Sequence, residues 1–418
     1  MTSHHERSAS RPGASFFRPP ASSATTVAPV DRIAPPTDPE PDGAVELTGP
    51  LRVSTFNCNA LADVKPHALG LTYEFPAAPD GDPYSVKIAF EGRRLGAKHQ
   101  PGPGDRFEAT TTVERVLPGS GRVAVTTRIP NVKAGSWRVV ARPSAHHIGP
   151  DRGSSRGARG ALPRLPGASA EGSTGWAPVI TQKAPGVLLG SWAALVAVGA
   201  AVGLTIQGVL AALLGLSVIG VGVVSLVASV IGLVGAKVYY LAVYPNARRQ
   251  ALSGGGMCIQ GFVLGASAGL IVGALVAGID LGSLLDITAP ALMFAMTIGR
   301  FGCFFSGCCV GRPTASRWGL WSSDRRLGVR RIPTQLLESA LAATIGATAL
   351  VVLVSAGFSE FPGVIFIGAM ATYVLGRQLL LPLRAEASKT RYGRLLTLAA
   401  AASVLLAAIV VAVITYAR

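Results

Sequence analysis

The segment 299–314 (GRFGCFFSGCCVGRPT) contains the residues of this chain that are best suited to binding or catalysis. Arg300 ends a long apolar run, at the depth where a membrane helix would meet the lipid headgroups. An ionisable residue there is costly to keep and therefore indicates function. The segment also holds three thiols and four glycines: Cys303, Cys308, Cys309, Gly299, Gly302, Gly307 and Gly311. Because glycine lets backbones approach closely, we interpret the segment as a pocket.

Few other polar residues accompany the apolar runs that follow residue 184. They include Arg377 and Arg384 near the ends of runs, Gln260, and Glu338 at the beginning of a run. A guanidinium binds phosphate through paired hydrogen bonds, so a phospholipid headgroup is the expected ligand. All six histidines precede residue 150, which excludes a Ser–His hydrolase in this half of the chain. The acids are not spaced as a general acid/base pair, and we expect no metal and no cofactor.

Apolar runs dominate the second half of the 418-residue chain, whose mean hydropathy is +0.44. A membrane helix needs about 20 apolar residues, and on this basis the sequence predicts a polytopic α-helical domain over 185–418. The predicted spans, about seven, are 186–206, 211–241, 257–279, 286–306, 334–356, 361–382 and 395–416. Four of the five cysteines lie in or beside these runs, so a disulfide framework is not expected.

The polar first half divides into three parts. Residues 1–44 are rich in Pro and Ser and predict a disordered tail. Residues 45–147 contain short β-branched and aromatic segments separated by Gly- and Pro-containing turns, which predict a small all-β, immunoglobulin-like sandwich. Residues 148–184 are rich in Gly, Ser and Arg and predict a flexible basic linker.

The formal net charge of +16 favours anionic lipid headgroups as partners. Nucleic acid is the weaker alternative and is not expected, because the arginines lie in short loops rather than along one helix face. The loops predicted on one side carry Asp280, Asp286 and Glu360, and those on the other side are basic. The positive-inside rule places the basic side and the N-terminus in the cytoplasm. The alternative is that the basic loops form a lipid-headgroup site on the outer side.

Several stretches, taken in order, resemble signatures of the prolipoprotein diacylglyceryl transferase family. They are residues 235–240 (GAKVYY), 254–261 (GGGMCIQG), 299–314, 333–338 (PTQLLE), 373–384 and 391–395 (RYGRL). The resemblance covers about residues 186–418, and the number of predicted spans agrees with it. The β-rich part of the chain has no counterpart in it.

This resemblance implies a multi-pass plasma-membrane enzyme. Members of the family transfer the diacylglyceryl group of phosphatidylglycerol to the lipobox cysteine of a prolipoprotein and release glycerol 1-phosphate. Arg300, Arg377 and Arg384 would then bind the phosphate, with the glycines of 299–314 shaping the pocket. In the family the loops that carry the arginines face the outside of the cell, opposite to the orientation that the charge rule predicts.

The chain departs from the family pattern at groups that could accept a proton. Gln260 stands where the signature has His, Cys303 and Cys308 stand where it has Asn and Glu, and Leu381 replaces another Glu. The remaining catalytic candidates are Glu338, Cys308 and Gln260. Cys308 or Cys309 would act as a base or a covalent relay if nearby arginines lower its pKa; alternatively, the cysteines are small packing residues. For Glu338 the alternatives are a helix cap or an ion pair with Arg331.

The sequence therefore supports three hypotheses. The first is transfer of diacylglyceryl from phosphatidylglycerol to a prolipoprotein cysteine. The second is a catalytically inactive relative that binds phospholipid or lipoprotein, and the third is another cysteine-dependent membrane transferase.

Overall fold

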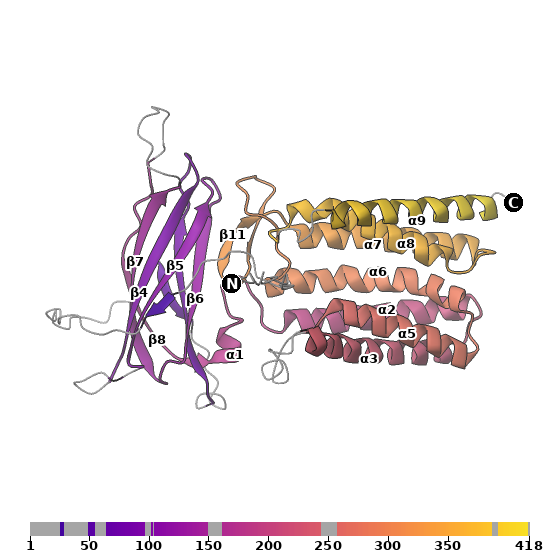
Figure 1. Cartoon of the computed structure of the whole chain (residues 1–418), viewed down its shortest axis with the longest axis horizontal. Coiled ribbons are helices and arrows are strands. Elements are labelled where there is room, and N and C mark those ends of the chain that lie inside the picture. The colour runs from indigo at the N-terminus through magenta and orange to yellow at the C-terminus, as the bar shows by residue number, and fades with distance from the viewer. Residues whose placement is uncertain are drawn as a thin grey trace, which may run out of the picture.

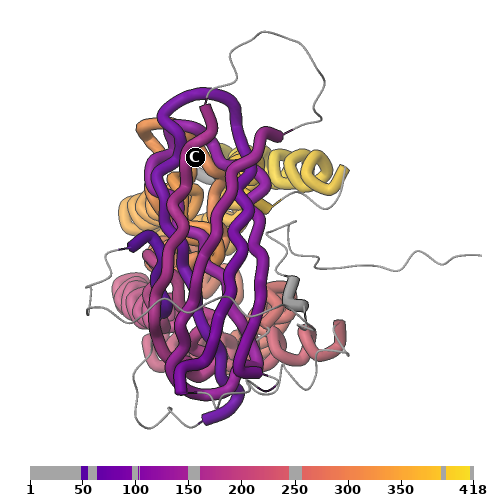
Figure 2. The backbone as a smooth tube through the Cα atoms, turned by 90° about the vertical axis from the view of Figure 1, so that its left-hand side faces the viewer, coloured from indigo at the N-terminus to yellow at the C-terminus, as the bar shows by residue number. Residues whose placement is uncertain are grey.

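The computed structural model describes residues 26–28, 49–54, 64–96, 102, 104–148, 161–243, 257–386 and 392–416. A β-sandwich and a bundle of long helices lie end to end along the longest axis of the molecule (Figure 1). Viewed from the β side, the sandwich stands in front of the helices (Figure 2). The predicted tail 1–44 lies outside the described residues, apart from the short strand β1 (Thr26–Ala28).

Two antiparallel sheets form the sandwich. One sheet has the order β1, β5 (Arg106–Val116), β4 (Tyr84–Arg94), β7 (Ser136–His147) and β8 (Ala168–Ser173). The other has the order β10 (Leu320–Ser323), β11 (Leu327–Arg331), β6 (Arg122–Pro130), β3 (His67–Pro76) and β2 (Leu51–Ser54). A short strand, β9 (Gly175–Trp176), also pairs with β3. The all-β character predicted for this region is confirmed.

The core of the sandwich follows from residue alternation along the strands. In β4 every second residue from Tyr84 to Phe90 is buried, as a strand with one face against a second sheet requires. Trp137 is fully buried in the same core, and its indole N–H donates to the Lys133 carbonyl oxygen over 3.2 Å. The region expected to be a linker contains β8 and β9, followed by the short helix α1 (Ala177–Ile180).

Seven helices among the described residues are long and apolar enough to cross a membrane. They are α2 (Ser191–Leu213), α3 (Val218–Val243), α5 (Ile259–Ala277), α6 (Leu281–Ser306), α7 (Thr334–Ala356), α8 (Val364–Leu380, extended by the 3-10 turn η3, Leu381–Leu383) and α9 (Gly393–Tyr416). The polytopic helical domain predicted from the apolar runs is confirmed. Strong pairings join α3 to α5, α2 to α6, α6 to α7 and α8 to α9.

The placement of Asp286 in a loop is wrong. Helix α6 begins five residues earlier, where the Asp280 carboxylate caps it by accepting the Ser283 N–H over 2.7 Å. Asp286 is fully buried inside α6, and its carboxylate accepts the N–H groups of Gly363 and Phe366 over 2.8 and 3.0 Å. The carboxylate thus satisfies donors that the first turn of α8 leaves unpaired. Local hydropathy cannot reveal this contact, because the partner lies on another helix.

The hairpin β10–β11 belongs in sequence to the connection between α6 and α7, yet it extends a sheet of the sandwich. Leu327 pairs with Val125 and Gly328 with Ala124 at the edge of β6. In addition, the Thr126 N–H donates to the Arg326 carbonyl oxygen over 2.7 Å. The β-sandwich and the helical bundle are therefore joined by a shared sheet as well as by the chain that leads into α2.

Candidate active site

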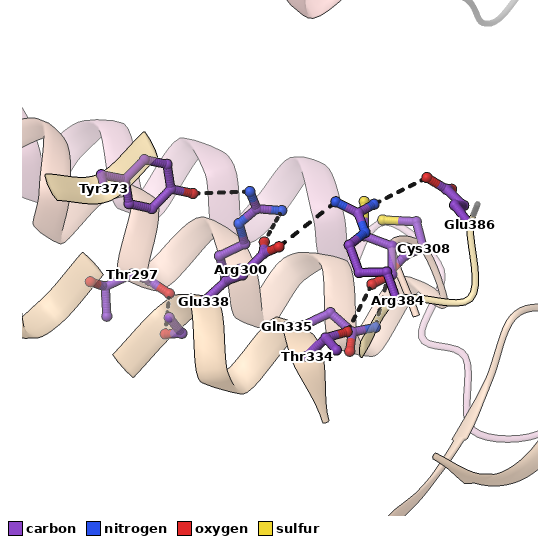
Figure 3. Close-up of polar contacts among 11 residues, drawn as sticks. Thr297, Arg300, Cys308, Thr334, Gln335, Glu338, Tyr373, Arg384 and Glu386 are labelled. Atoms are coloured by element: carbon purple, nitrogen blue, oxygen red, sulfur yellow. Dashed lines mark hydrogen bonds and ion pairs between the residues drawn. The ribbon is translucent and has the colours of Figure 1, made fainter. Parts of the chain in front are cut away.

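Three side chains from different elements meet at the end of the bundle that faces the sandwich (Figure 3). Glu338, in the first turns of α7, is 1% exposed and binds two arginines. Its Oε2 lies 2.9 Å from Arg300 Nη1, and its Oε1 lies 3.7 Å from Arg384 Nη1. Arg300 comes from the last turns of α6, and Arg384 directly follows η3. We call these residues the arginine–glutamate cluster.

Further hydrogen bonds fix the cluster in place. The Tyr373 hydroxyl, on α8, accepts a hydrogen bond from Arg300 Nη2 over 3.1 Å. Ser339, next to Glu338, donates from its Oγ to the Thr297 carbonyl oxygen over 2.8 Å and so ties α7 to α6. Helices α6, α7 and α8 are thereby held around one buried carboxylate.

The buried groups of the cluster carry more positive than negative charge. Two guanidinium groups share the buried Glu338, while the second acid beside Arg384 is Glu386, whose side chain is 60% exposed at 3.2 Å. Arg384 is 5% exposed, and among the described residues its Nε has no hydrogen-bond partner. A buried charge normally needs a partner, so the arrangement suits an anion such as a phosphate group.

The cysteines gather on a loop at the end of α6. Gly307 has a left-handed backbone (φ 68°), which ends the helix and turns the chain back, so that the Cys308 N–H donates to the Cys303 carbonyl oxygen over 3.1 Å. As a result the Sγ atoms of Cys303, Cys308 and Cys309 all lie within 4.8 Å of one another. We call these three residues the cysteine triad.

Side chains from the beginning of α7 and from β11 hold the carbonyl groups of this loop. Gln335 Nε2 donates to the Cys308 carbonyl oxygen over 3.0 Å, and Thr334 Oγ1 to that of Cys309 over 3.3 Å. Arg331, which is 2% exposed, donates from Nη1 to the Gly311 carbonyl oxygen over 3.2 Å. Its ion pair is with Asp324 at 2.8 Å, so it is not a partner of Glu338 in this structure.

The electrostatic setting of the loop favours thiolate at one position. Hydrogen bonds from Cys303 and Cys308, together with the positive charges of Arg384 and Arg300, lower the pKa of the Cys309 thiol. The arginines act at close range because residues 383–385 run beside the loop. The Ala385 N–H donates to the Val310 carbonyl oxygen over 3.0 Å.

The predicted pocket glycines serve different contacts. Gly299 and Gly302 face α2, where a Cβ at Gly302 would lie 3.2 Å from the Cα of Trp192. A Cβ at Gly311 would collide with the Ile332 carbonyl oxygen, so only glycine permits the close approach of these two loops. Gly307 supplies the turn after α6.

Two other predicted site residues lie apart from the cluster. Gln260 is exposed at the beginning of α5, where its Oε1 accepts a hydrogen bond from Cys258 Sγ over 2.6 Å, and α5 packs mainly against α3. Arg377 is exposed on the last turns of α8, and the described contacts do not connect it to Glu338. Arg384, Arg300 and Glu338 are the predicted residues that the fold brings together.

A cleft of about 260 Å³ opens beside the cysteine triad, between the beginning of α2 and the end of α6. Its lining includes Cys308, Ser306, Arg325, Leu188 and Trp192. The cleft therefore connects a thiol of the triad with an apolar surface.

Sequence reasoning missed the contributions of Tyr373, Gln335, Thr334 and Arg331. The first three lie within the motifs quoted above, and their place in these motifs is the signal that could have identified them. Their roles depend on contacts with backbone or side chains from other elements, which spacing along the chain does not reveal.

Comparison with known proteins agrees with this architecture. The family model for prolipoprotein diacylglyceryl transferase matches residues 178–416, which is more than half of the chain. The chain therefore belongs to the prolipoprotein diacylglyceryl transferase family, a family of multi-pass membrane transferases.

Curated relatives with the name phosphatidylglycerol–prolipoprotein diacylglyceryl transferase match parts of this region. One from Dehalococcoides mccartyi is 35% identical over 103 residues, covering 24% of this chain and 38% of the relative. One from Nostoc sp. is 31% identical over 166 residues, covering 35% and 58%. A protein from Streptomyces coelicolor, named as the second such transferase, is 32% identical over 161 residues, covering 35% and 50%. The matches thus span between about a third and three-fifths of these relatives.

Proposed function

We propose that this chain transfers the diacylglyceryl group of phosphatidylglycerol to the lipobox cysteine of prolipoproteins at the plasma membrane. The observation that carries the proposal is the buried arginine–glutamate cluster at one end of the helical bundle. Family membership and the names of the relatives support the reaction class and the phospholipid donor.

Charge balance explains how the cluster would bind the donor. The phosphodiester of phosphatidylglycerol carries one negative charge, so it can take the place of the exposed Glu386 carboxylate beside the two guanidinium groups that share Glu338. Arg384 Nε, buried and without a partner among the described residues, supplies a donor for a phosphate oxygen. Glu338 then acts as a positioning residue that holds both guanidinium groups in place.

The same arginines would stabilise the transition state. The acceptor thiolate attacks the diacylglyceryl carbon, a sulfur–carbon bond forms, and the bond from that carbon to the phosphate oxygen breaks. The electron pair of the broken bond stays on the leaving glycerol phosphate, so negative charge grows on oxygens beside Arg300 and Arg384. Fixed donors aimed at developing charge are a large source of rate acceleration.

A specific observation favours one alternative, a catalytically inactive relative that binds phospholipid or lipoprotein. The histidine of the family signature is replaced by Gln260, which is exposed and bonded to Cys258 rather than to the cluster. Such a protein would keep phosphatidylglycerol binding and lack transfer.

The test uses the full chain, reconstituted in vesicles with labelled phosphatidylglycerol and a lipobox peptide. We expect lipidated peptide and free glycerol phosphate, and a loss of kcat/KM of about 100-fold or more in Arg384→Ala, as for removal of an oxyanion donor. Arg317→Ala is the matched control, because Arg317 is exposed in the connection between α6 and α7 and stacks on Trp318. Binding of phosphatidylglycerol without any transfer by the unaltered chain would support the inactive relative instead.

A further inference from the structure

The cysteine triad has no part in the phosphate chemistry described above, and its geometry suits a metal ion. All three Sγ atoms lie within 4.8 Å of one another. In a tetrahedral zinc site with Zn–S bonds of about 2.3 Å, neighbouring sulfurs are about 3.8 Å apart. The thiols are therefore close to ligand spacing before any ion binds.

The backbone is shaped to bring the thiols together. Cys303 lies on the last turn of α6, and the left-handed Gly307 reverses the chain so that the next two residues return toward it. Cys309 itself has a φ of 55°, a left-handed conformation that residues with a side chain seldom adopt. Strained backbone of this kind persists where the surrounding structure fixes it, and it concentrates at functional sites.

Fixed contacts hold the loop that carries the triad. Gln335, Thr334 and Arg331 each bind a loop carbonyl oxygen, as described above. In addition, the Arg325 guanidinium donates from Nε to the Ser306 carbonyl oxygen over 2.7 Å. A site whose ligands are positioned by such secondary contacts is preorganised.

The surroundings also provide access and charge compensation. Cys303 is 8% exposed, but Cys308 and Cys309 are half-buried, and Cys308 lines the 260 Å³ cleft. A site with three protein ligands and an approach from a cleft keeps a fourth position for a substrate. Three thiolates and a divalent cation carry one net negative charge, and Arg384, whose segment pairs with the loop through Gly311, lies beside them.

We propose that Cys303, Cys308 and Cys309 bind one thiophilic divalent cation, Zn²⁺, and that the thiol of the acceptor cysteine occupies the fourth position. The acceptor role rests on the proposed function. The chain has no histidine after residue 150, and Glu338 is held by two arginines, so another group must generate the acceptor thiolate. Zn²⁺ favours the thiolate form, and the proton leaves to solvent as the thiol binds.

The first experiment measures metal content without reference to catalysis. The full chain is purified in detergent with a phosphine reductant, loaded with Zn²⁺, desalted and analysed by mass spectrometry for zinc per chain. We expect one zinc, lost from Cys303→Ser, Cys308→Ser and Cys309→Ser and retained by Cys258→Ser, whose thiol lies outside the triad. Zinc that remains in all three triad variants, or substoichiometric zinc in the unaltered chain, would overturn the site.

The second experiment tests the open position and needs only the unaltered chain. Loading with Co²⁺ should give the visible d–d bands of a tetrahedral thiolate site. Adding a lipobox peptide should change these bands, and the same peptide with serine in place of cysteine should not. A cobalt spectrum that neither peptide changes would overturn the acceptor role. Zinc binding and a peptide response without lipid transfer would uphold the site and refute the proposed transferase activity.

Discussion

At the scale of single residues, one carboxylate organises the site. Glu338 is buried and touches arginines from two other segments, so it determines where both guanidinium groups lie. The pairing also explains why a strongly polar set is tolerated near apolar helices, because a buried charge persists when an opposite charge lies beside it. The two guanidinium groups share this buried carboxylate and have one exposed acid, Glu386, beside them, so a ligand with a single negative charge can replace the exposed acid.

Tyr373→Phe tests the support given to Arg300. The change removes the hydroxyl that accepts from Arg300 Nη2 over 3.1 Å and leaves the ring in place. A hydrogen bond to a charged group contributes about 1.5–3 kcal/mol, so kcat/KM in the vesicle transfer assay should fall about tenfold or more.

The control for this prediction is Tyr239→Phe, on α3 and 37% exposed. It should retain the activity of the unaltered chain. Unchanged kinetics in Tyr373→Phe would show that Arg300 does not depend on the hydroxyl.

At the scale of elements, polar groups inside the bundle act as connectors between helices. Asp286 of α6 caps the first turn of α8 from the side, and it lies far from the arginine–glutamate cluster along the same helix. Helix α8 is thus positioned at its beginning by Asp286 and at its middle by the contact of Tyr373 with Arg300. Both contacts hold α8 against α6.

Asp286→Ala should destabilise the helical domain by about 2 kcal/mol, because the N–H groups of Gly363 and Phe366 at the beginning of α8 lose their acceptor. The measurement is thermal unfolding in detergent, followed by circular dichroism of the helices. Asp280→Ala removes the cap at the beginning of α6 and should cost about 1 kcal/mol. Equal effects of the two substitutions would contradict the importance given to the cap of α8.

At the scale of the whole molecule, hydrogen bonds connect the sandwich to the site. Arg128 of β6 donates from Nη2 to the carbonyl oxygens of Arg325 over 2.6 Å and Lys183 over 3.1 Å. Burial, with the charges of Arg326 and Arg325 nearby, lowers the pKa of Arg128 to about 10. Because Arg325 in turn holds the end of α6, a short chain of contacts runs from the sandwich to the cysteine triad.

Arg128→Ala should loosen the attachment of the hairpin and, through Arg325, the loop after α6. We expect faster amide hydrogen exchange in residues 320–331, measured by mass spectrometry on the full chain, and a loss of transfer activity of several-fold. Arg142→Ala on the other sheet is the control, since this exposed arginine pairs with Glu91 and makes no described contact with the hairpin. Unaltered exchange in Arg128→Ala would argue against the linkage.

Features that depend on the local pattern of residues could be predicted from the sequence. Apolar length located the seven spans, and alternation located strands such as β4 and β6. The sequence was insufficient where distant segments meet. The pairing of Leu327 with Val125, the cap that Asp286 supplies to α8 and the convergence of three thiols around Gly307 all depend on tertiary contacts. Arg300, Glu338 and Arg384 could be proposed from their types, but not the carboxylate shared between them.

The shared sheet has a consequence for the order of events during synthesis. Strand β6 is made early, yet its partner β11 emerges only after α2, α3, α5 and α6 have been translated. Until then β6 has an open edge, and an open edge can pair with other chains. The sandwich therefore reaches its final form only after four of the seven spans have been synthesised. A complete sandwich requires that the first part of the helical bundle is already present.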